Sequence, residues 1–400
     1  MTTIPQVAPI RQVLSQPTVA ELAGETRRQW QQSRLAQRIR PGDRVAVAVG
    51  SRGIKNVAVL VRATLGYLRD LGAKPFVLAA MGSHGGATSE GQRQLLAEYG
   101  VSEDQLGVLV MTDMTSVQIG VNSWGEPVWW DRNALEADAV VTISRVKPHT
   151  DFRGKYESGI LKMLVIGLGK REGASQHHHW GMRGLRDMLP ETGKVVLEKT
   201  RFLAGLAVLE NAREETARLQ AVDREEVLAV EPGLLEEARR LMGRLPFDQL
   251  DLLVIGEIGK NYSGAGIDPN VVGRLLIEGA PEPESPRITR ICCLDLSPES
   301  HGNGTGVGIA DLTTERLLAQ IDPGPFRMNN LTACFLWRSK LPIAFPTDRE
   351  CIDMGVQTCW QPKHDALRMA VIPNTLEMSE LWVSAPLVEE AKKHSHLEVT

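Results

Sequence analysis

The residues that could carry chemistry are concentrated in one stretch, from Ser144 to Trp180. It contains Lys162 and four of the chain's nine histidines, which are His149 and the consecutive residues 177–179. Lys162 interrupts an apolar run, where a buried charge is unfavourable unless the amine has a partner or a covalent role. We interpret this stretch as the core of a metal or cofactor site.

Each residue type in this set has a definite chemical capacity. Imidazoles bind borderline metals such as nickel or zinc, or transfer protons near neutral pH. A lysine amine such as that of Lys162 can carry a cofactor covalently or react with a carbonyl group. Arg52, earlier in the chain, can hold a carboxylate or phosphate through two hydrogen bonds. Together they suggest chemistry on a small anionic substrate.

Each residue also has an ordinary structural interpretation. Lys162 could lie on a half-buried helix with its amine reaching solvent. The histidine triplet could be a solvated loop, and His84 could occupy a surface turn. The joint occurrence of these residues near predicted strand ends favours a common functional site over three unrelated structural roles.

The elements that must position these residues alternate between strand and helix. Residues 43–50 and 74–82 are apolar runs that end in glycine and predict buried strands, and residues 57–71 between them have a helical pattern. This βαβ alternation is typical of a parallel sheet, whose ligands collect where the strands end. The loop after the first strand offers Ser51, Arg52 and Lys55.

The loop after the second predicted strand has the sequence GSHGGATSEGQ. Gly82 and Ser83 precede His84 there, and we predict that both contact a cofactor. Ser89 and Gln92 resemble a capping box that starts the helix 90–98. A further strand, residues 139–144, leads directly into the stretch described first.

The second half of the chain begins a new domain. Residues 232–245 predict a charged helix with its proline in the first turn, and 251–259 begin a fresh buried strand. We therefore predict two domains, residues 1–246 binding the cofactor and residues 247–400 closing over the substrate. The predicted fold is α/β, with mainly parallel sheets and the active site in the interdomain cleft. The glycines at 302, 304, 306 and 308 lack the spacing of a dinucleotide-binding loop.

Composition excludes several classes of function. Of the 400 residues, 42% are hydrophobic and 24% charged, with a net charge of −4, so neither a nucleic acid nor a membrane is an expected partner. No apolar segment approaches the roughly 18 residues that span a bilayer, and the N-terminus lacks a signal peptide pattern, so we expect a cytoplasmic protein. All five cysteines follow residue 290, which favours free thiols. Homo-oligomerisation is left open.

Four segments resemble the nickel-pincer lactate racemase family: GSHGGAT, KPHTDF, SGILKMLVIGLG and the histidine triplet. The family pattern has a histidine in a GTH-type turn, a PH segment followed by a lysine, and another histidine about sixteen residues after that lysine. Counting from Lys162, that position is His178. The similarity covers the first domain well and the second only in outline.

This resemblance implies a role for each matching residue. Lys162 would hold a pyridinium-3-thioamide-5-thiocarboxylic acid mononucleotide, the nickel pincer nucleotide, and His178 would be the protein's ligand to Ni(II). His84 and His149 would be the paired acid and base on a 2-hydroxy acid, while Arg52 would lie near substrate or cofactor anions. The implied activity is an isomerase that racemises or epimerises by reversible hydride transfer to the cofactor. The implied partners are the substrate and the cofactor-biosynthesis enzymes.

The departures from the family pattern concern the substrate. Val49 replaces an acidic residue, and Gly85 replaces an arginine after the turn histidine. Three extra residues lie between the PH segment and the lysine. The tyrosine and lysine that help to bind lactate lack clear counterparts, and we predict substrate contacts from Lys260, Asn270 and Arg274 instead. These changes favour a 2-hydroxy acid other than lactate, larger or more polar.

Two other functions stay open at this point. The same histidines could form a zinc site for hydrolysis or lyase chemistry, with Asp151, Glu157 or Glu172 as general base. That alternative leaves Lys162 unexplained. The chain could also be a non-catalytic protein that binds an anion or a cofactor.

Overall fold

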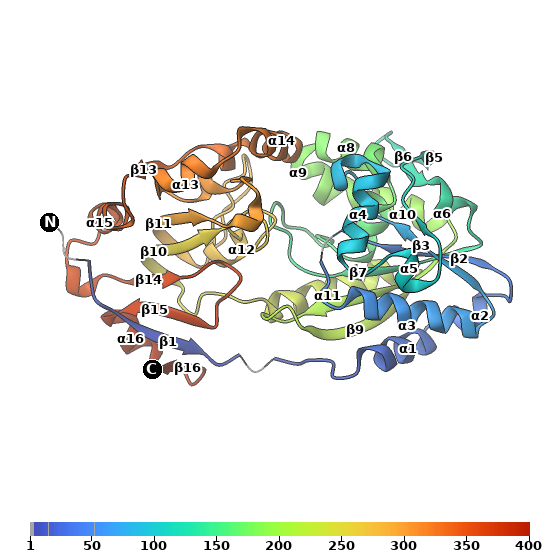
Figure 1. Cartoon of the computed structure of the whole chain (residues 1–400), viewed down its shortest axis with the longest axis horizontal. Helices are drawn as coiled ribbons and strands as arrows, with labels where there is room; N and C mark the ends of the chain where they lie inside the picture. The colour runs from blue at the N-terminus through green and yellow to red at the C-terminus, as the bar shows by residue number, and fades with distance from the viewer. Residues whose placement is uncertain (1–3, 15, 52) are drawn as a thin grey trace. The chain divides into compact units, whose positions relative to one another are not determined.

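The computed structural model describes residues 4–14, 16–51 and 53–400, and the chain divides into two compact units (Figure 1). The first unit contains residues 16–242. The second unit contains residues 243–400 together with the N-terminal segment 4–14. The predicted boundary, after residue 246, therefore lies close to the observed one, but the N-terminal segment belongs to the second unit rather than the first.

The first unit is built on a six-stranded sheet in the order β4-β3-β2-β7-β8-β9. All neighbours are parallel except β8 and β9. Its strands are β2 (Arg44–Val49), β3 (Lys74–Ala79), β4 (Val110–Met111), β7 (Ala139–Arg145), β8 (Phe202–Glu210) and β9 (Thr216–Asp223). A separate hairpin joins β5 (Ser116–Val121) to β6 (Pro127–Asp131).

Helices cover both faces of this sheet because alternate residues of its strands are buried on opposite sides. Along β2, Val45, Val47 and Val49 pack with Trp30 and Leu60, whereas Ala46 and Ala48 belong to the core that contains the helices of the 144–180 stretch. The helices are α1 (Leu22–Gln32), α2 (Leu35–Arg38), α3 (Val57–Asp70), α4 (Ser89–Glu98), α5 (Glu103–Leu106), α6 (Arg132–Glu136), α7 (Ile160–Lys162), α8 (Lys170–His179), α9 (Gly181–Arg183), α10 (Leu189–Lys199) and α11 (Val227–Leu241).

Helix α11 differs from its prediction. It begins at Val227, before the predicted start at Pro232, so the proline lies inside the helix rather than in its first turn. The missing amide is compensated: the carbonyl of Leu228, four residues earlier, accepts a hydrogen bond of 2.7 Å from Tyr156 Oη.

The second unit contains an eight-stranded sheet in the order β13-β12-β11-β10-β14-β15-β1-β16. The first five strands in this order are parallel, and the last three pair antiparallel. The N-terminal strand belongs to this sheet because it pairs with β15 and β16, a long-range pairing without a local signal. The strands are β1 (Val7–Gln12), β10 (Gln249–Ile258), β11 (Arg287–Leu296), β12 (Leu312–Thr314), β13 (Ile343–Phe345), β14 (Met369–Ile372), β15 (Glu380–Ser384) and β16 (Leu397–Val399).

The helices of the second unit are α12 (Pro269–Val272), α13 (Glu315–Gln320), α14 (Pro323–Ala333), α15 (Asp348–Thr358) and α16 (Ala385–Ala391). The five cysteines all lie in this unit and are free thiols, as predicted. Among the helices of the described residues, none combines the length and apolar character needed to cross a bilayer. Both units are α/β with mostly parallel sheets, which confirms the predicted fold class.

Candidate functional site

The predicted site residues of the first unit follow the ends of three adjacent parallel strands. Val49 of β2 pairs with Ala79 of β3 on one side and with Ile143 of β7 on the other. The segments that follow these strands carry Ser51, His84 and His149. Parallel neighbours therefore bring segments distant in sequence to one edge of the sheet, as the βαβ pattern predicted.

His84 is an exposed side chain held in a turn with several supports. Ser51 Oγ hydrogen-bonds to Nδ1 of His84, and the Ser51 carbonyl accepts from Tyr99 Oη at 2.8 Å. Gln92 Nε2 donates to the carbonyls of Gly82 (3.1 Å) and His84 (3.2 Å). The turn is therefore fixed from two sides, and Ser51 orients the imidazole.

The predicted capping box at the start of α4 is wrong. Thr88 is the cap, and its hydroxyl accepts from the N–H of Gly91 at 3.1 Å. Gln92 cannot complete the box because its amide binds the carbonyls of the preceding turn. The predicted cap lies one residue too late in the chain, and the tertiary role of Gln92 has no local signal.

Gly82 brings the His84 turn against the segment that carries Lys162. Its N–H donates to the Gly167 carbonyl at 3.0 Å, and its φ of +57° suits glycine. A Cβ at this position would lie 3.0 Å from the Ile166 carbonyl oxygen. Ser83, the other predicted cofactor contact in this turn, is half-buried.

His149 is buried, with 2% of its surface exposed, and its backbone and ring are both held. Its N–H donates to Glu157 Oε2 at 2.8 Å. The N–H of Asp151 donates to its Nδ1 at 3.0 Å, so in the neutral ring the proton resides on Nε2. Asp151 Oδ2 lies 3.7 Å from the same Nδ1 and would stabilise the protonated ring. These contacts suit a histidine that donates and recovers a proton at Nε2.

Phe152 brings His149 and Lys162 together. The His149 ring centroid lies 4.7 Å from that of Phe152, and Lys162 Nζ lies 5.2 Å from the Phe152 centroid. Lys162 ends α7 and is followed by a π-helical turn, Met163–Gly167, a feature that is frequent at functional sites. Lys162 is half-buried, so the predicted apolar surroundings are only partly present.

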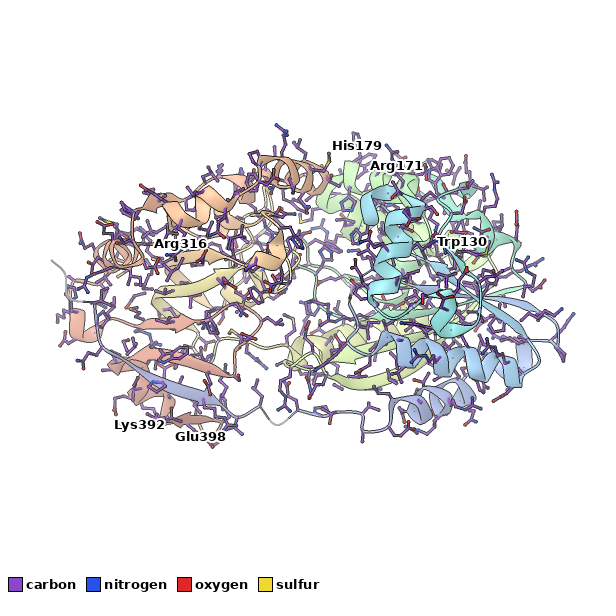
Figure 2. All side chains as sticks on the ribbon, viewed as in Figure 1. Trp130, Arg171, His179, Arg316, Lys392 and Glu398 are labelled. Carbon is purple, nitrogen blue, oxygen red and sulfur yellow. The ribbon has the colours of Figure 1, made fainter. Side chains whose placement is uncertain are left out.

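The histidine triplet occupies the last turn of α8, which excludes the solvated-loop interpretation. Its three members have different surroundings. His177 is buried and hydrogen-bonds to the Gly173 carbonyl (2.8 Å) and Thr192 Oγ1 (3.1 Å), and burial lowers its pKa to about 4. His178 is half-buried, whereas His179 is exposed on the outside of the unit (Figure 2).

A buried ion pair that the sequence did not reveal supports this helix. Lys170, the first residue of α8, is fully buried with φ of +55°, and its Nζ lies 2.7 Å from Asp131 Oδ2. The same amine donates to the Ala79 carbonyl at the end of β3, at 2.8 Å. Lys170 therefore connects α8 to the strand end that precedes the His84 turn.

A second buried pair holds the loop after β2. Arg145 Nε lies 2.6 Å from Glu210 Oε2, and burial raises the pKa of Glu210 while Arg145 opposes that rise. Arg145 Nη1 donates to the Gly53 carbonyl (2.9 Å), and the N–H of Lys55 donates to Glu210 Oε1 (3.0 Å). Arg52, the predicted anion ligand in this loop, lies outside the described residues.

Two of the carboxylates available to a zinc mechanism are engaged elsewhere. Glu157 is fully buried and holds the His149 backbone. Glu172 accepts from Ser116 Oγ at 2.8 Å. Within the described residues, no three His, Cys, Asp or Glu side chains gather as a metal site.

The three predicted substrate contacts of the second unit have partners inside that unit. Lys260 Nζ donates to the Gly264 carbonyl (2.6 Å) and to Asn329 Oδ1 (2.9 Å). Asn270 donates to Asp268, the cap of α12. Arg274 has its guanidinium 2.9 Å from Asp311 Oδ2 and also donates to the carbonyls of residues 288 and 309. These bonds give Arg274 a structural role, and contacts with substrate stay a prediction.

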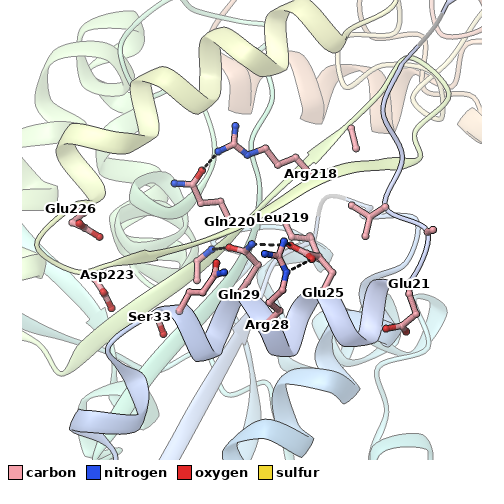
Figure 3. A pocket seen from close by; sticks show the side chains of 15 residues that line it. Glu21, Glu25, Arg28, Gln29, Ser33, Arg218, Leu219, Gln220, Asp223 and Glu226 are labelled. Carbon is pink, nitrogen blue, oxygen red and sulfur yellow. Dashed lines mark hydrogen bonds and ion pairs between the residues drawn. The ribbon is translucent and has the colours of Figure 1, made fainter.

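An open groove of about 830 Å³ lies between α1 and β9 in the first unit (Figure 3). Glu25 pairs with Arg28 along its floor at 2.7 Å, and Gln29 accepts from the Ala221 N–H of the edge strand at 3.1 Å. The Gln29 contact gives one N–H of this edge strand a partner. The predicted site residues that the structure describes do not line this groove, so we assign it no part in their chemistry.

Comparison with known proteins finds one similar domain model and similar folds. Residues 10–186 match the sequence model of the lactate racemase N-terminal domain. The lactate racemase apoprotein from Thermoanaerobacterium thermosaccharolyticum is similar in structure, with a TM-score of 0.53 and 11% identity over 93% of this chain and 99% of that chain. A crystal structure of a Thermotoga maritima protein aligns with a TM-score of 0.47 and 14% identity, over 68% of this chain and 69% of that chain. Comparison with curated proteins gives no match. The chain is therefore similar to the lactate racemase N-terminal domain over residues 10–186 and shares the fold of the lactate racemase apoprotein.

Proposed function

We propose that the protein is a racemase or epimerase of a 2-hydroxy acid. One observation carries the proposal: the family match over residues 10–186 includes His84, His149, Lys162 and His178, and Phe152 contacts both His149 and Lys162. The match to the lactate racemase N-terminal domain supports a racemase-type activity in general. The particular substrate and the residue roles are part of the proposal.

The residues present fit a nickel pincer nucleotide in their chemistry. Lys162 offers an amine for covalent attachment, and His178 offers an imidazole, a ligand that suits nickel. His178 is the protein ligand that the proposal assigns to nickel, and Lys162 would hold the nucleotide. When bound, this cofactor supplies reversible acceptance of a hydride from the substrate carbon.

Histidines of the chain would accept and return the substrate's hydroxyl proton. His149, with its proton on Nε2 in the neutral ring, would act on one enantiomer, and His84, oriented through Ser51, would act on the other. Arg52 would lie near substrate or cofactor anions, and Gly82 and Ser83 would lie against the cofactor. The substrate contacts predicted for Lys260, Asn270 and Arg274 in the second unit stay a separate prediction.

The first test asks whether the chain takes up the cofactor. The chain is co-expressed with the cofactor-biosynthesis enzymes, and intact mass and metal content are measured. We expect a mass adduct on Lys162 and about one nickel per chain, both lost in K162R. Zinc without an adduct would instead support a hydrolase or lyase, and an adduct without any turnover would support a non-catalytic cofactor-binding protein.

The loaded protein is then assayed for racemisation of a panel of 2-hydroxy acids by chiral chromatography. We expect activity on acids larger or more polar than lactate, and loss of at least about a hundredfold in H84Q and H149Q. His301→Gln, in the second unit, is a control for replacing a histidine. Lactate as the clear best substrate would contradict the predicted specificity.

A further inference from the structure

One face of helix α11 contacts the stretch that carries His149 and Lys162. Leu228, Glu231 and Arg239 are spaced by three and by eight residues, which places them on the same side of a helix. Each of the three touches a residue between 156 and 161. Leu235, between them on this face, is buried in the same core as Ile160 and Leu164.

Glu231 holds the start of the helix that presents Lys162. Its side chain is fully buried, and Oε2 accepts from the N–H of Leu161 at 3.0 Å. Gly159, with φ of +94°, lies directly beside it, and a Cβ there would be 3.0 Å from Glu231 Cδ. The first N–H groups of a helix lack partners within the helix, so Glu231 supplies one from a distant element.

Arg239, two turns further along α11, acts on the His149 side. Its Nη2 lies 2.5 Å from Oε1 of Glu157, a fully buried carboxylate. Glu157 accepts from the N–H of His149 through Oε2 (2.8 Å) and from the N–H of Gly154 through Oε1 (2.9 Å). Arg239 therefore compensates the buried charge that fixes the backbone of the His149 loop.

We propose that α11 is a positioning element for the reaction: Glu231 sets the helix that presents Lys162, and Arg239 sets, through Glu157, the loop that presents His149. Neither residue is a catalytic residue, since each acts through another. The inference rests on the proposed function, because it takes Lys162 and His149 as members of the site. The hydrogen bonds at α11 would fix the distance between the cofactor anchor and the proton-transferring imidazole.

The test uses the full chain produced without cofactor, so that Lys162 retains its amine. Acylation of lysines is followed by peptide mass spectrometry, with the exposed Lys194 of α10 as the internal reference. E231L, which removes the acceptor for the Leu161 N–H, should change the labelling rate of Lys162 relative to Lys194 at least fivefold. E231Q, which keeps a side-chain oxygen at that place, should stay within twofold of the wild type.

Amide hydrogen exchange tests the role of Glu231 separately from the role of Arg239. E231L should accelerate exchange at residues 160–167 at least tenfold and leave residues 149–154 within threefold, whereas R239M should do the reverse. R240M, at the exposed neighbouring arginine, is the matched control and should change neither segment. If E231L does not fold, E231D withdraws the carboxyl by one methylene and should give the same local pattern.

Uniform acceleration across the unit in E231L and R239M would overturn the proposal, because it would show a merely global stabilising role. Unchanged exchange in both segments, or Lys162 labelling within twofold in E231L, would also overturn it. None of these measurements requires substrate, nickel or turnover. Failure of the proposed racemase activity would therefore be recorded separately from failure of the positioning role.

Discussion

The stability of the first unit should fall with rising pH because of Glu231. This carboxyl is completely buried, and burial raises its pKa from 4.5 to about 8, although the Leu161 and Ile160 amides oppose the rise. Among the described residues, no group hydrogen-bonds to Oε1. Tyr156 faces it, and burial, with a smaller contribution from Glu231, raises the pKa of Tyr156 as well. The protonated form is therefore the one that the fold favours at neutral pH.

The sign and size of this change in the free energy of unfolding follow from proton linkage. Because the folded-state pKa is raised, the stabilisation is complete below the unfolded pKa of 4.5 and is lost as the pH rises through 8. Each pH unit in this window removes about 1.4 kcal/mol, and the window of roughly 3.5 units gives about 5 kcal/mol in total. The glutamine in E231Q does not titrate, so this variant lacks the dependence.

Amide exchange of peptides from β2 and β7 reports unfolding of this unit separately from the other. Between pH 5.5 and 7.5 the free energy of unfolding of the wild type should decrease relative to E231Q by about 3 kcal/mol. E198Q, which removes an exposed carboxylate from α10 of the same unit, controls for the change of charge. Parallel pH profiles for wild type and E231Q would refute a protonated Glu231 in the folded state.

Three further predictions concern the elements around the site. D131N leaves Lys170 buried without its charged partner, and the free energy of unfolding, measured by urea titration, should decrease by about 3–5 kcal/mol; D131N combined with K170M should recover part of the loss. G82A introduces a Cβ at positive φ against the Ile166 carbonyl and should destabilise the unit by at least about 1 kcal/mol in the same titration. H178Q should abolish nickel retention in the loaded protein, measured by metal analysis, whereas H179Q should retain it; equal loss in both would contradict the assignment.

The parts of the fold that depend on local pattern could be predicted from the sequence. The structure confirms β2, β3 and β7, which were predicted from apolar runs, and α3, which was predicted from its helical pattern. These patterns depend only on neighbouring residues. The predicted start of α11 is wrong because proline is most often found in the first turn of a helix. Here the Tyr156 hydroxyl satisfies the carbonyl that the proline leaves open, and that partner is 72 residues away.

The candidate site also contains residues that the sequence indicates and residues that only the structure reveals. The interrupted apolar run pointed to Lys162, and the spacing of the family pattern distinguished His178 from its neighbours; both roles stay predictions with definite structural surroundings. The residues that hold the site in place could not be found this way: Glu231, Lys170 and Asp131 are ionisable residues in sequences that look like ordinary exposed helix or hairpin. Only burial reveals them, because an ionisable side chain that is fully removed from water must pair with a specific partner, as Lys170 and Asp131 do, or become neutral, as Glu231 does.

The buried pair of Glu157 and Arg239 also explains how a short segment without regular structure can hold a functional group in place. The stretch from 146 to 159 has no regular secondary structure, yet its His149 is almost completely buried. Its backbone amides are bound by the carboxylate of Glu157, and Arg239 of α11 balances that charge. A carboxylate that binds several N–H groups can replace the hydrogen bonds that a helix or strand would provide. The precision of the proposed site therefore resides in α11 and its charged partners, while the loop is left to present the imidazole.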